Sequence, residues 1–247
     1  MQKKNTEMDL FSNFKSSPVK GVFDGFTDWH CHILPGVDDG VKTIEDSLLI
    51  LDRYEQIGVE NVILTPHIMV DIPNETADLK ATFEELKAAY KGKVHLTLAA
   101  ENMIDNLFYK RLEQGDLLAL PGNRLLVETS YFNPPVDLLG TLVEIRKAGY
   151  TPVLAHPERY EYMSARTYEN IYDEEVEFQL NLPALLGFYG KGVQLRAEWL
   201  LKEDFYYICG TDLHRKSQLT SILEASLKRP MLKKLSESVL AISDGQL

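Results

Sequence analysis

The chain has 247 residues, 45% of them hydrophobic, which is enough for one sizeable core. Its formal net charge of −11 disfavours nucleic acid or an anionic membrane surface as the main partner. Two cysteines cannot build a disulfide framework, no apolar run approaches membrane-spanning length, and residues 1–8 lack the apolar segment of a signal peptide, so we expect a cytoplasmic protein.

Residues 1–22 are polar and mixed, and we expect a leader that is loose or packs on the body formed by residues 23–247. Apolar runs bounded by turn residues predict strands in that body. They lie near residues 26–33, 61–67, 95–101, 125–130, 151–157, 176–182 and 206–211.

Helical patterns fall between several of these strands. Thr43 and Asp46 resemble a capping box, and an apolar stripe at helical spacing follows them up to Ile57. Further helices are predicted over residues 79–90, 136–149, 191–204 and 217–241, the last broken near Pro230. Strands that alternate with helices predict a parallel sheet, and at this length an α/β barrel in a single domain.

The first strand ends in two histidines. Successive strand residues point to opposite sides, so His30 and His32 face the same way and Cys31 faces the other. Asp39 follows after a short turn. Two neighbouring imidazoles with a carboxylate close behind predict the beginning of a metal site.

Histidines and acids also stand at the ends of later strands. They are His67, Glu101, Glu128, His156, Asp212 and His214. The carboxyl ends of the strands of a β/α barrel meet at one face, where catalytic residues gather. His95 begins its strand instead, so we expect it at the opposite face in a structural role.

The two glutamates strengthen the metal hypothesis. Glu101 and Glu128 are poor helix caps, since Ser, Thr, Asp and Asn dominate at that position. A cation is the simplest partner for several buried carboxylates at once. Imidazole and carboxylate ligands without thiolate suit Mn, Fe or Zn.

Four motifs together resemble the polymerase-and-histidinol-phosphatase (PHP) superfamily, and more narrowly the bacterial manganese-dependent protein tyrosine phosphatases of capsule and exopolysaccharide gene clusters. The motifs are His30-Cys31-His32-Ile33-Leu34-Pro35-Gly36-Val37-Asp38-Asp39-Gly40, Thr65-Pro66-His67, Ala155-His156-Pro157-Glu158-Arg159-Tyr160 and Asp212-x-His214, with Glu101 and Glu128 between them. The resemblance extends from about residue 26 to about residue 214 and includes residues 185–190.

This resemblance implies a distorted (β/α)7 TIM-like barrel that holds two to three divalent ions, with Mn²⁺ the first choice. One ion would be bound by His30, His32, Glu101 and Asp212, a second by Glu101, Glu128 and His156, and a third by Asp39, His67 and His214. The catalytic residues would be Arg159, Asp212 and His214, and Arg159 would also bind the substrate phosphate. The family has a further arginine just beyond Asp212-x-His214, and Arg215 or Lys216 would replace it here, Arg215 being our choice.

The implied reaction is removal of phosphate from a tyrosine-phosphorylated protein, such as the tail of an autokinase that controls polysaccharide export. Clustered divalent ions lower the pKa of water and neutralise a phosphoryl group, and a guanidinium binds phosphate through two parallel hydrogen bonds. A tyrosine leaving group, with a pKa of about 10, needs little protonation. No separate acid stands out among the motif residues, and this favours an aryl ester over an alkyl ester.

Four alternatives compete with this interpretation. A small-molecule phosphatase of the histidinol phosphatase kind would use the same metal site. A metal-dependent amidohydrolase would need a histidine after the sixth strand, where the chain reads Gln179-Leu180-Asn181. The segment from Cys209 to Arg215 matches the C-x5-R pattern of cysteine-based phosphatases, but Asp212 within that loop would repel a phosphate. A metal-binding scaffold without catalysis is the fourth alternative.

Overall fold

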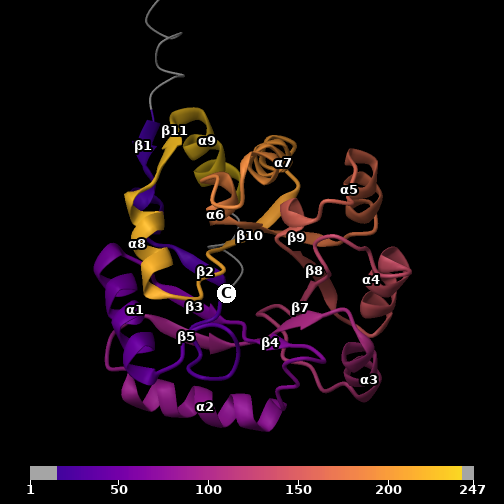
Figure 1. Ribbon diagram of the computed structural model, residues 1–247, viewed down its shortest axis with the longest axis horizontal. Helices are drawn as coiled ribbons and strands as arrows, with labels where there is room; N and C mark the ends of the chain where they lie inside the picture. The colour runs from indigo at the N-terminus through magenta and orange to yellow at the C-terminus, as the bar shows by residue number, and fades with distance from the viewer. Residues whose placement is uncertain (1–15, 241–247) are drawn as a thin grey trace, which may run out of the picture.

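A computed structural model describes residues 16–240, and within this range parallel strands form the wall of a barrel (Figure 1). The strands are β2 (Thr27–Cys31), β3 (Asn61–Leu64), β4 (His67–Ile68), β5 (His95–Leu98), β6 (Glu101–Met103), β7 (Arg124–Glu128), β8 (Thr151–Ala155), β9 (Glu177–Asn181) and β10 (Tyr206–Gly210). They pair in the orders β2-β3-β5 and β10-β9-β8-β7-β6-β4, so each wall position follows the previous one along the chain. The predicted α/β barrel with strands at seven positions is confirmed.

Two of the predicted strands are interrupted. The expected strand over residues 61–67 divides into β3 and β4 at Thr65-Pro66, and that over residues 95–101 divides into β5 and β6 at Ala99-Ala100. Proline has no N–H to donate to a neighbouring strand. Ladder hydrogen bonds continue across the break, since the N–H of Glu101 donates to the carbonyl of Pro66 at 3.1 Å. The two sheets therefore join at this point.

The barrel closes where β10 meets β2. The N–H of Asp212 donates to the carbonyl of His30 at 2.7 Å, and the N–H of His32 donates to the carbonyl of Leu213 at 2.8 Å. Gly210 permits this approach, because a Cβ at that position would lie 2.5 Å from the Cβ of His30. Closure thus brings the last strand end against the first histidine pair.

Helices surround the barrel. They are α1 (Ile44–Ile57), α2 (Thr76–Ala89), α3 (Asn106–Gln114), α4 (Leu138–Lys147), α5 (Ala165–Tyr172), α6 (Leu182–Leu185), α7 (Lys191–Lys202), α8 (Lys216–Glu224) and α9 (Arg229–Lys234), with a π-helical turn over Leu235–Leu240. The side chain of Thr43 accepts from the N–H of Asp46 at 3.3 Å, as the capping pattern predicts.

The helix predicted over residues 217–241 is interrupted near Pro230. α8 ends at Glu224, and strand β11 (Ser226–Lys228) precedes α9. Pro230 occupies the first turn of α9, where its missing N–H has no intrahelical partner to lose. The break predicted near Pro230 is confirmed and lies just before it, at residues 225–228, because this proline begins a helix rather than ending one.

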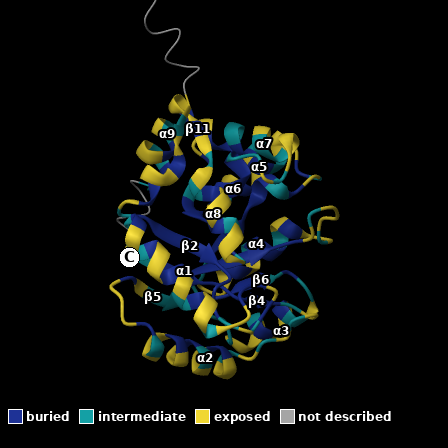
Figure 2. Cartoon of the chain, turned by 60° about the vertical axis from the view of Figure 1, so that its left-hand side comes forward, coloured by how far each residue is buried: buried dark blue, intermediate teal, exposed yellow. Residues whose placement is uncertain are grey.

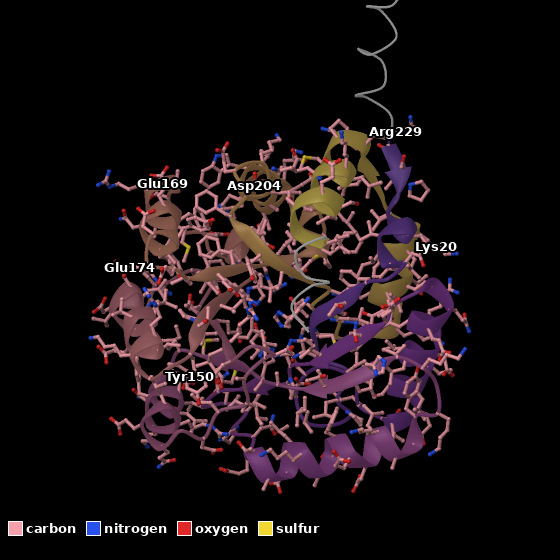
Figure 3. The ribbon with its side chains drawn as sticks, turned by 180° about the vertical axis from the view of Figure 1, so that it is seen from behind. Lys20, Tyr150, Glu169, Glu174, Asp204 and Arg229 are labelled. Carbon is pink, nitrogen blue, oxygen red and sulfur yellow. The ribbon has the colours of Figure 1, made fainter. Side chains whose placement is uncertain are left out.

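Two apolar layers hold the elements together. One fills the barrel with strand residues such as Trp29, Ile63, Leu126, Val153 and Ile208, and the other lies between strands and helices. Figure 2 shows strand β2 as buried and the outer faces of α1 and α2 as exposed. Charged residues such as Lys20, Glu169 and Arg229 lie at the periphery (Figure 3). No helix within residues 16–240 is long and apolar enough to cross a membrane.

Residues 16–23 pack on the barrel. Strand β1 (Ser16–Pro18) pairs antiparallel with β11, and the 3₁₀ helix Val19–Phe23 buries Val19, Val22 and Phe23. Of the leader predicted over residues 1–22, residues 1–15 lie outside the described residues, and residues 16–22 pack against the body of the protein.

Candidate metal centre and active site

Six of the nine predicted metal ligands lie at or just beyond the carboxyl ends of β2, β7, β8 and β10. Of the others, His67 and Glu101 begin the short strands β4 and β6, which follow β3 and β5, and Asp39 lies in the loop after β2. Two of the nine have left-handed backbone conformations, with φ of 33° at His156 and 51° at Asp212. Such a conformation is uncommon outside glycine and is most tolerated by Asn, Asp and His. His156 comes directly after β8 and Asp212 two residues after β10, where the chain turns at the edge of the site.

The first histidine pair faces the site as predicted. A shift in register between Asp28 and Cys31 lets β2 place both Trp29 and His30 on the barrel side. The Nε2 atoms of His30 and His32 are 3.0 Å apart, whereas Cys31 packs in the layer beneath the helices.

Glu101 occupies the centre of the cluster. Its Oε2 atom lies 3.2 Å from Nε2 of His30, 3.3 Å from Nε2 of His32 and 3.0 Å from Nδ1 of His67. Its Oε1 atom lies 2.9 Å from Nε2 of His156. One carboxylate thus contacts four imidazoles from three strand ends, which is the position a bridging ligand requires.

Three ligand atoms converge here without hydrogen-bonding geometry. His67 Nδ1 lies 3.0 Å from Glu101 Oε2 and 3.1 Å from Glu128 Oε1. All three atoms are buried and have no hydrogen-bond partner among the described residues. Leaving such groups unsatisfied is costly, and a divalent cation would satisfy them together. The donor set, nitrogen and oxygen without sulfur, fits such an ion.

A second group lies nearer the surface. Asp39 Oδ1 is 3.6 Å from Nε2 of His67 and 3.4 Å from Nε2 of His214. The rings of His32 and His214 stack at 4.1 Å. The potential ligand atoms fall into three groups: His32, Asp39, His67 and His214; His30, His32 and Glu101; and His67, Glu101 and Glu128.

These groups differ in detail from the expected ligand sets. Asp212 lies beside the group of His30, His32 and Glu101, its Oδ1 atom 3.4 Å from Nε2 of His32. His156 lies beside the third group, and Nε2 of His156 is 3.8 Å from Glu128 Oε2. The division of the nine residues among individual ions stays a prediction.

Two residues that the sequence did not single out hold the histidines in place. Asp38 Oδ2 accepts from Nδ1 of His32 at 2.9 Å, and Gln179 Oε1 accepts from Nδ1 of His30 at 2.9 Å. Such partners fix the ring orientation and raise the basicity of the nitrogen that faces a metal. The adjacent acids Asp38 and Asp39 were a usable signal, but nothing in the sequence distinguished the supporting acid from the ligand.

The histidines also set the charge of the site. Burial opposes ionisation of Asp212 and Glu101, but the surrounding imidazoles outweigh it and hold the pKa of both carboxyls well below the usual range. Burial likewise opposes ionisation of Asp38, yet its hydrogen bond from His32 lowers its pKa to about 2. The carboxylates are therefore anionic at neutral pH.

A pocket of about 580 Å³ opens over the cluster. It is lined by Asp39, His67, Glu101, Tyr131, His156, Arg159, Phe188, Tyr189, Asp212, His214, Arg215, Ser217, Gln218 and Ser221. Arg159 Nη1 donates to Asp212 Oδ2 at 2.9 Å. Both arginines expected to bind phosphate thus face one pocket with the metal-ligand candidates, Arg159 mostly buried and Arg215 exposed.

The remaining sequence features lie away from this chemistry. Cys209 is fully buried and does not line the pocket, and burial raises the pKa of its thiol well above the ordinary value. A buried thiol in this state is a poor nucleophile. His95 is exposed and begins β5, at the end of the barrel opposite the pocket, as expected.

Similarity to known proteins agrees with this geometry. The chain is 28% identical over 207 residues to the tyrosine-protein phosphatase CpsB of Streptococcus pneumoniae, an alignment that covers 76% of this chain and 82% of that protein. It is 26% identical over 194 residues to the tyrosine-protein phosphatase YwqE of Bacillus subtilis, with 76% of each chain covered.

Solved structures share the fold. A crystal structure from work on YwqE of B. subtilis and CpsB of S. pneumoniae, metal-dependent tyrosine phosphatases, superposes with a TM-score of 0.73 at 23% identity, covering 90% of this chain and 96% of that one. An amidohydrolase from Mycoplasma synoviae superposes with a TM-score of 0.57 at 13% identity, covering 93% and 88%. The family model for capsular polysaccharide synthesis proteins CpsB/CapC matches residues 26–241, and the chain belongs to this family.

Proposed function

We propose that this chain is a metal-dependent phosphatase that hydrolyses phosphotyrosine on protein substrates. The observation that carries the proposal is the convergence of unsatisfied buried atoms of His67, Glu101 and Glu128 beside an arginine in an open pocket. Membership of the CpsB/CapC family and the tyrosine-protein phosphatase names of two relatives support the same activity.

The nine residues would hold two to three divalent ions. Their imidazoles and carboxylates suit Mn, Fe or Zn, and the resemblance to manganese-dependent phosphatases makes Mn²⁺ the ion we propose. When bound, such ions supply a nucleophile at neutral pH and neutralise phosphoryl charge. Arg159 binds phosphate oxygens from the pocket side. Asp212 serves two partners, since Oδ1 lies beside the histidines and Oδ2 accepts from Arg159. His214, whose Nε2 atom is 3.4 Å from Asp39 Oδ1, would bind an ion on the side of the site nearer the surface.

Phosphotyrosine suits this site because a phenolate is a good leaving group at neutral pH. Of the three carboxyl groups among the described residues that line the pocket, Glu101 and Asp212 have a pKa held well below the usual range, so neither is suited to donate a proton. An alkyl ester would need such a donor. The substrate we propose is the tyrosine-phosphorylated tail of an autokinase for polysaccharide export, in the cytoplasm, where the free Cys31 and Cys209 would stay reduced.

The test is a metal analysis coupled to phosphatase assays. Protein stripped with chelator should lose hydrolysis of a phosphotyrosyl peptide, and Mn²⁺ should restore it. The reloaded enzyme should have a higher kcat/KM for this peptide than for a phosphoseryl peptide or histidinol phosphate. Full activity in metal-free protein would refute the metal mechanism, whereas preference for histidinol phosphate would refute only the substrate.

A cysteine variant separates the two phosphatase chemistries. Cys209→Ser should keep most of the activity, because its thiol is buried outside the pocket. An inactive variant that trapped phosphorylated substrate would favour the cysteine-based mechanism instead.

A further inference from the structure

The guanidinium of Arg159 lies between two tyrosine rings. Its central carbon is 4.1 Å from the ring centroid of Tyr131 and 4.4 Å from that of Tyr189. Tyr131 comes from the segment after β7, and Tyr189 from the segment between α6 and α7. Two loops far apart in the sequence therefore contribute one ring each to the same cation.

The stack continues into the protein behind Tyr131. Tyr160 stacks on Tyr131 with ring centroids 6.2 Å apart at 24°, and Tyr162 stacks on Tyr160 at 5.7 Å and 19°. Tyr160 is fully buried, and its hydroxyl accepts from the N–H of Thr129 at 3.2 Å. We refer to Tyr162, Tyr160, Tyr131 and Tyr189 as the aromatic column. Its buried part fixes the position of Tyr131.

One edge of the guanidinium is held as well. Nη1 of Arg159 donates to Asp212 Oδ2 at 2.9 Å, and Nδ2 of Asn181 donates to the same oxygen at 2.9 Å. The side chain of Arg159 is 18% exposed and lines the pocket. With two tyrosine rings packed against the guanidinium and Nη1 bonded to Asp212, the remaining N–H groups are left for a ligand in the pocket.

We propose that Tyr131 and Tyr189 are positioning residues that hold the plane of Arg159 in the orientation that binds the substrate phosphate, an inference that rests on the proposed phosphatase function. An arginine side chain is long and flexible, and its two parallel hydrogen bonds to phosphate require a defined plane. Aromatic faces attract a guanidinium and restrict its rotation without competing for its N–H groups. The rings thus restrict the rotation of the Arg159 guanidinium before the substrate arrives, so phosphate binding does not have to supply that ordering.

The structure offers a matched comparison at the other end of the barrel. The guanidinium carbon of Arg124 lies 5.1 Å from the ring of Tyr207, where β7 and β10 begin. Tyr207→Leu therefore removes an arginine–tyrosine ring contact far from the pocket, together with the hydrogen bond that Arg124 Nη2 donates to the Tyr207 hydroxyl at 3.2 Å. Its effect on phosphate affinity measures how far the loss of an arginine–tyrosine contact outside the pocket affects phosphate binding indirectly.

The experiment uses metal-loaded full-length protein and inorganic phosphate as the probe. Tyr131→Leu and Tyr189→Leu should each weaken phosphate binding in calorimetry, and raise KM for a phosphotyrosyl peptide, by about ten-fold, with kcat and metal content changed far less. Tyr131→Phe and Tyr189→Phe, which keep the ring face, should restore both values to within about two-fold of the parent. Tyr207→Leu should bind phosphate as the parent does.

A double variant gives the decisive result. If the rings act through the arginine, Arg159→Ala with Tyr189→Leu should bind phosphate no more weakly than Arg159→Ala alone. Additive losses, or leucine variants with unchanged phosphate affinity, would overturn the proposal. Phenylalanine variants as weak as leucine variants would also overturn it, because the hydroxyl would then be the active group.

Two further controls keep the result interpretable. If Tyr131→Leu fails to fold, the half-buried Tyr189 carries the same test from the pocket wall. Absence of phosphotyrosine hydrolysis in the parent would refute the proposed function, while the phosphate affinities of the same variants would still decide the role of the column.

Discussion

Charged side chains are buried at both ends of the barrel, but in different surroundings. At the amino ends of the strands, Arg124 Nε donates to Glu177 Oε2 at 2.7 Å, so the two charges satisfy each other. At the carboxyl ends, atoms of His67, Glu101 and Glu128 meet within 3.0–3.1 Å without hydrogen-bonding geometry. Burial alone therefore does not mark the functional end. The functional end is marked instead by buried charged groups that lack a complete set of hydrogen-bond partners.

The largest expected difference comes from removing one acid at each end. Asp212→Ala should lower kcat/KM by more than about 100-fold, since even residues that only support metal ligands cost 10–100-fold. Glu177→Ala should leave kcat/KM within about two-fold but lower the free energy of unfolding by about 1–3 kcal/mol, because Arg124 loses a charged partner. Steady-state kinetics and urea unfolding of both variants would measure this. If Glu177→Ala were the inactive variant, the assignment of catalysis to the carboxyl ends of the strands would be wrong.

A smaller effect is expected from the acid that supports His32. Asp38→Ala removes the acceptor at Nδ1 of His32, so metal affinity should fall by about 10–100-fold. Competition with a chromophoric chelator would measure the affinity. Asp52→Ala, an exposed acid on α1, is the matched control. Equal affinities in the two variants would mean that Asp38 does not orient the ligand.

The smallest expected effect concerns a buried carboxyl beside the site that has its own partners. Burial raises the pKa of Glu158 to about 7 from an ordinary 4.5, although Tyr206 and the N–H of Asn181 donate to it. The folded chain thus keeps this proton to a higher pH than the unfolded chain. The contribution to stability is present below pH 4.5 and is lost as pH rises through about 7.

Glu158→Gln tests this sign. The free energy of unfolding of Glu158→Gln relative to the parent should be higher at pH 8 than at pH 5 by an amount of order 1 kcal/mol, measured with chelator at both pH values. A difference between the two proteins that does not vary with pH would show that Glu158 does not titrate in this range.

Much of the fold followed from sequence because strand ends are local features. Apolar runs that end in His67, Glu128 or His156 identify both a strand and the face on which its last residue lies. The interruption at Pro66 was harder to predict from the sequence, since it depends on which neighbouring strands β3 and β4 pair with. The position of the break before α9 also required tertiary information, because Pro230 can either begin or end a helix.

The candidate site was predicted less evenly. The ligand candidates come from short motifs, and the structure brings them together around one pocket. Gln179 and Tyr189 act through atoms contributed by distant segments, and no spacing in the sequence connects them to His30 or Arg159. Supporting residues are harder to predict because their role is defined by the partner they contact.

Closure of the barrel also determines when the site can form during synthesis. β2 carries His30, but its neighbour β10 is made about 180 residues later, and β1 pairs with β11, which is later still. A ribosome-bound chain therefore presents histidines and glutamates whose final partners have not yet been translated. The full set of nine candidate ligands, which includes Asp212 and His214, would therefore come together only after β10 has been made. We expect the slow step of folding to be the long-range pairing of the first and last strands.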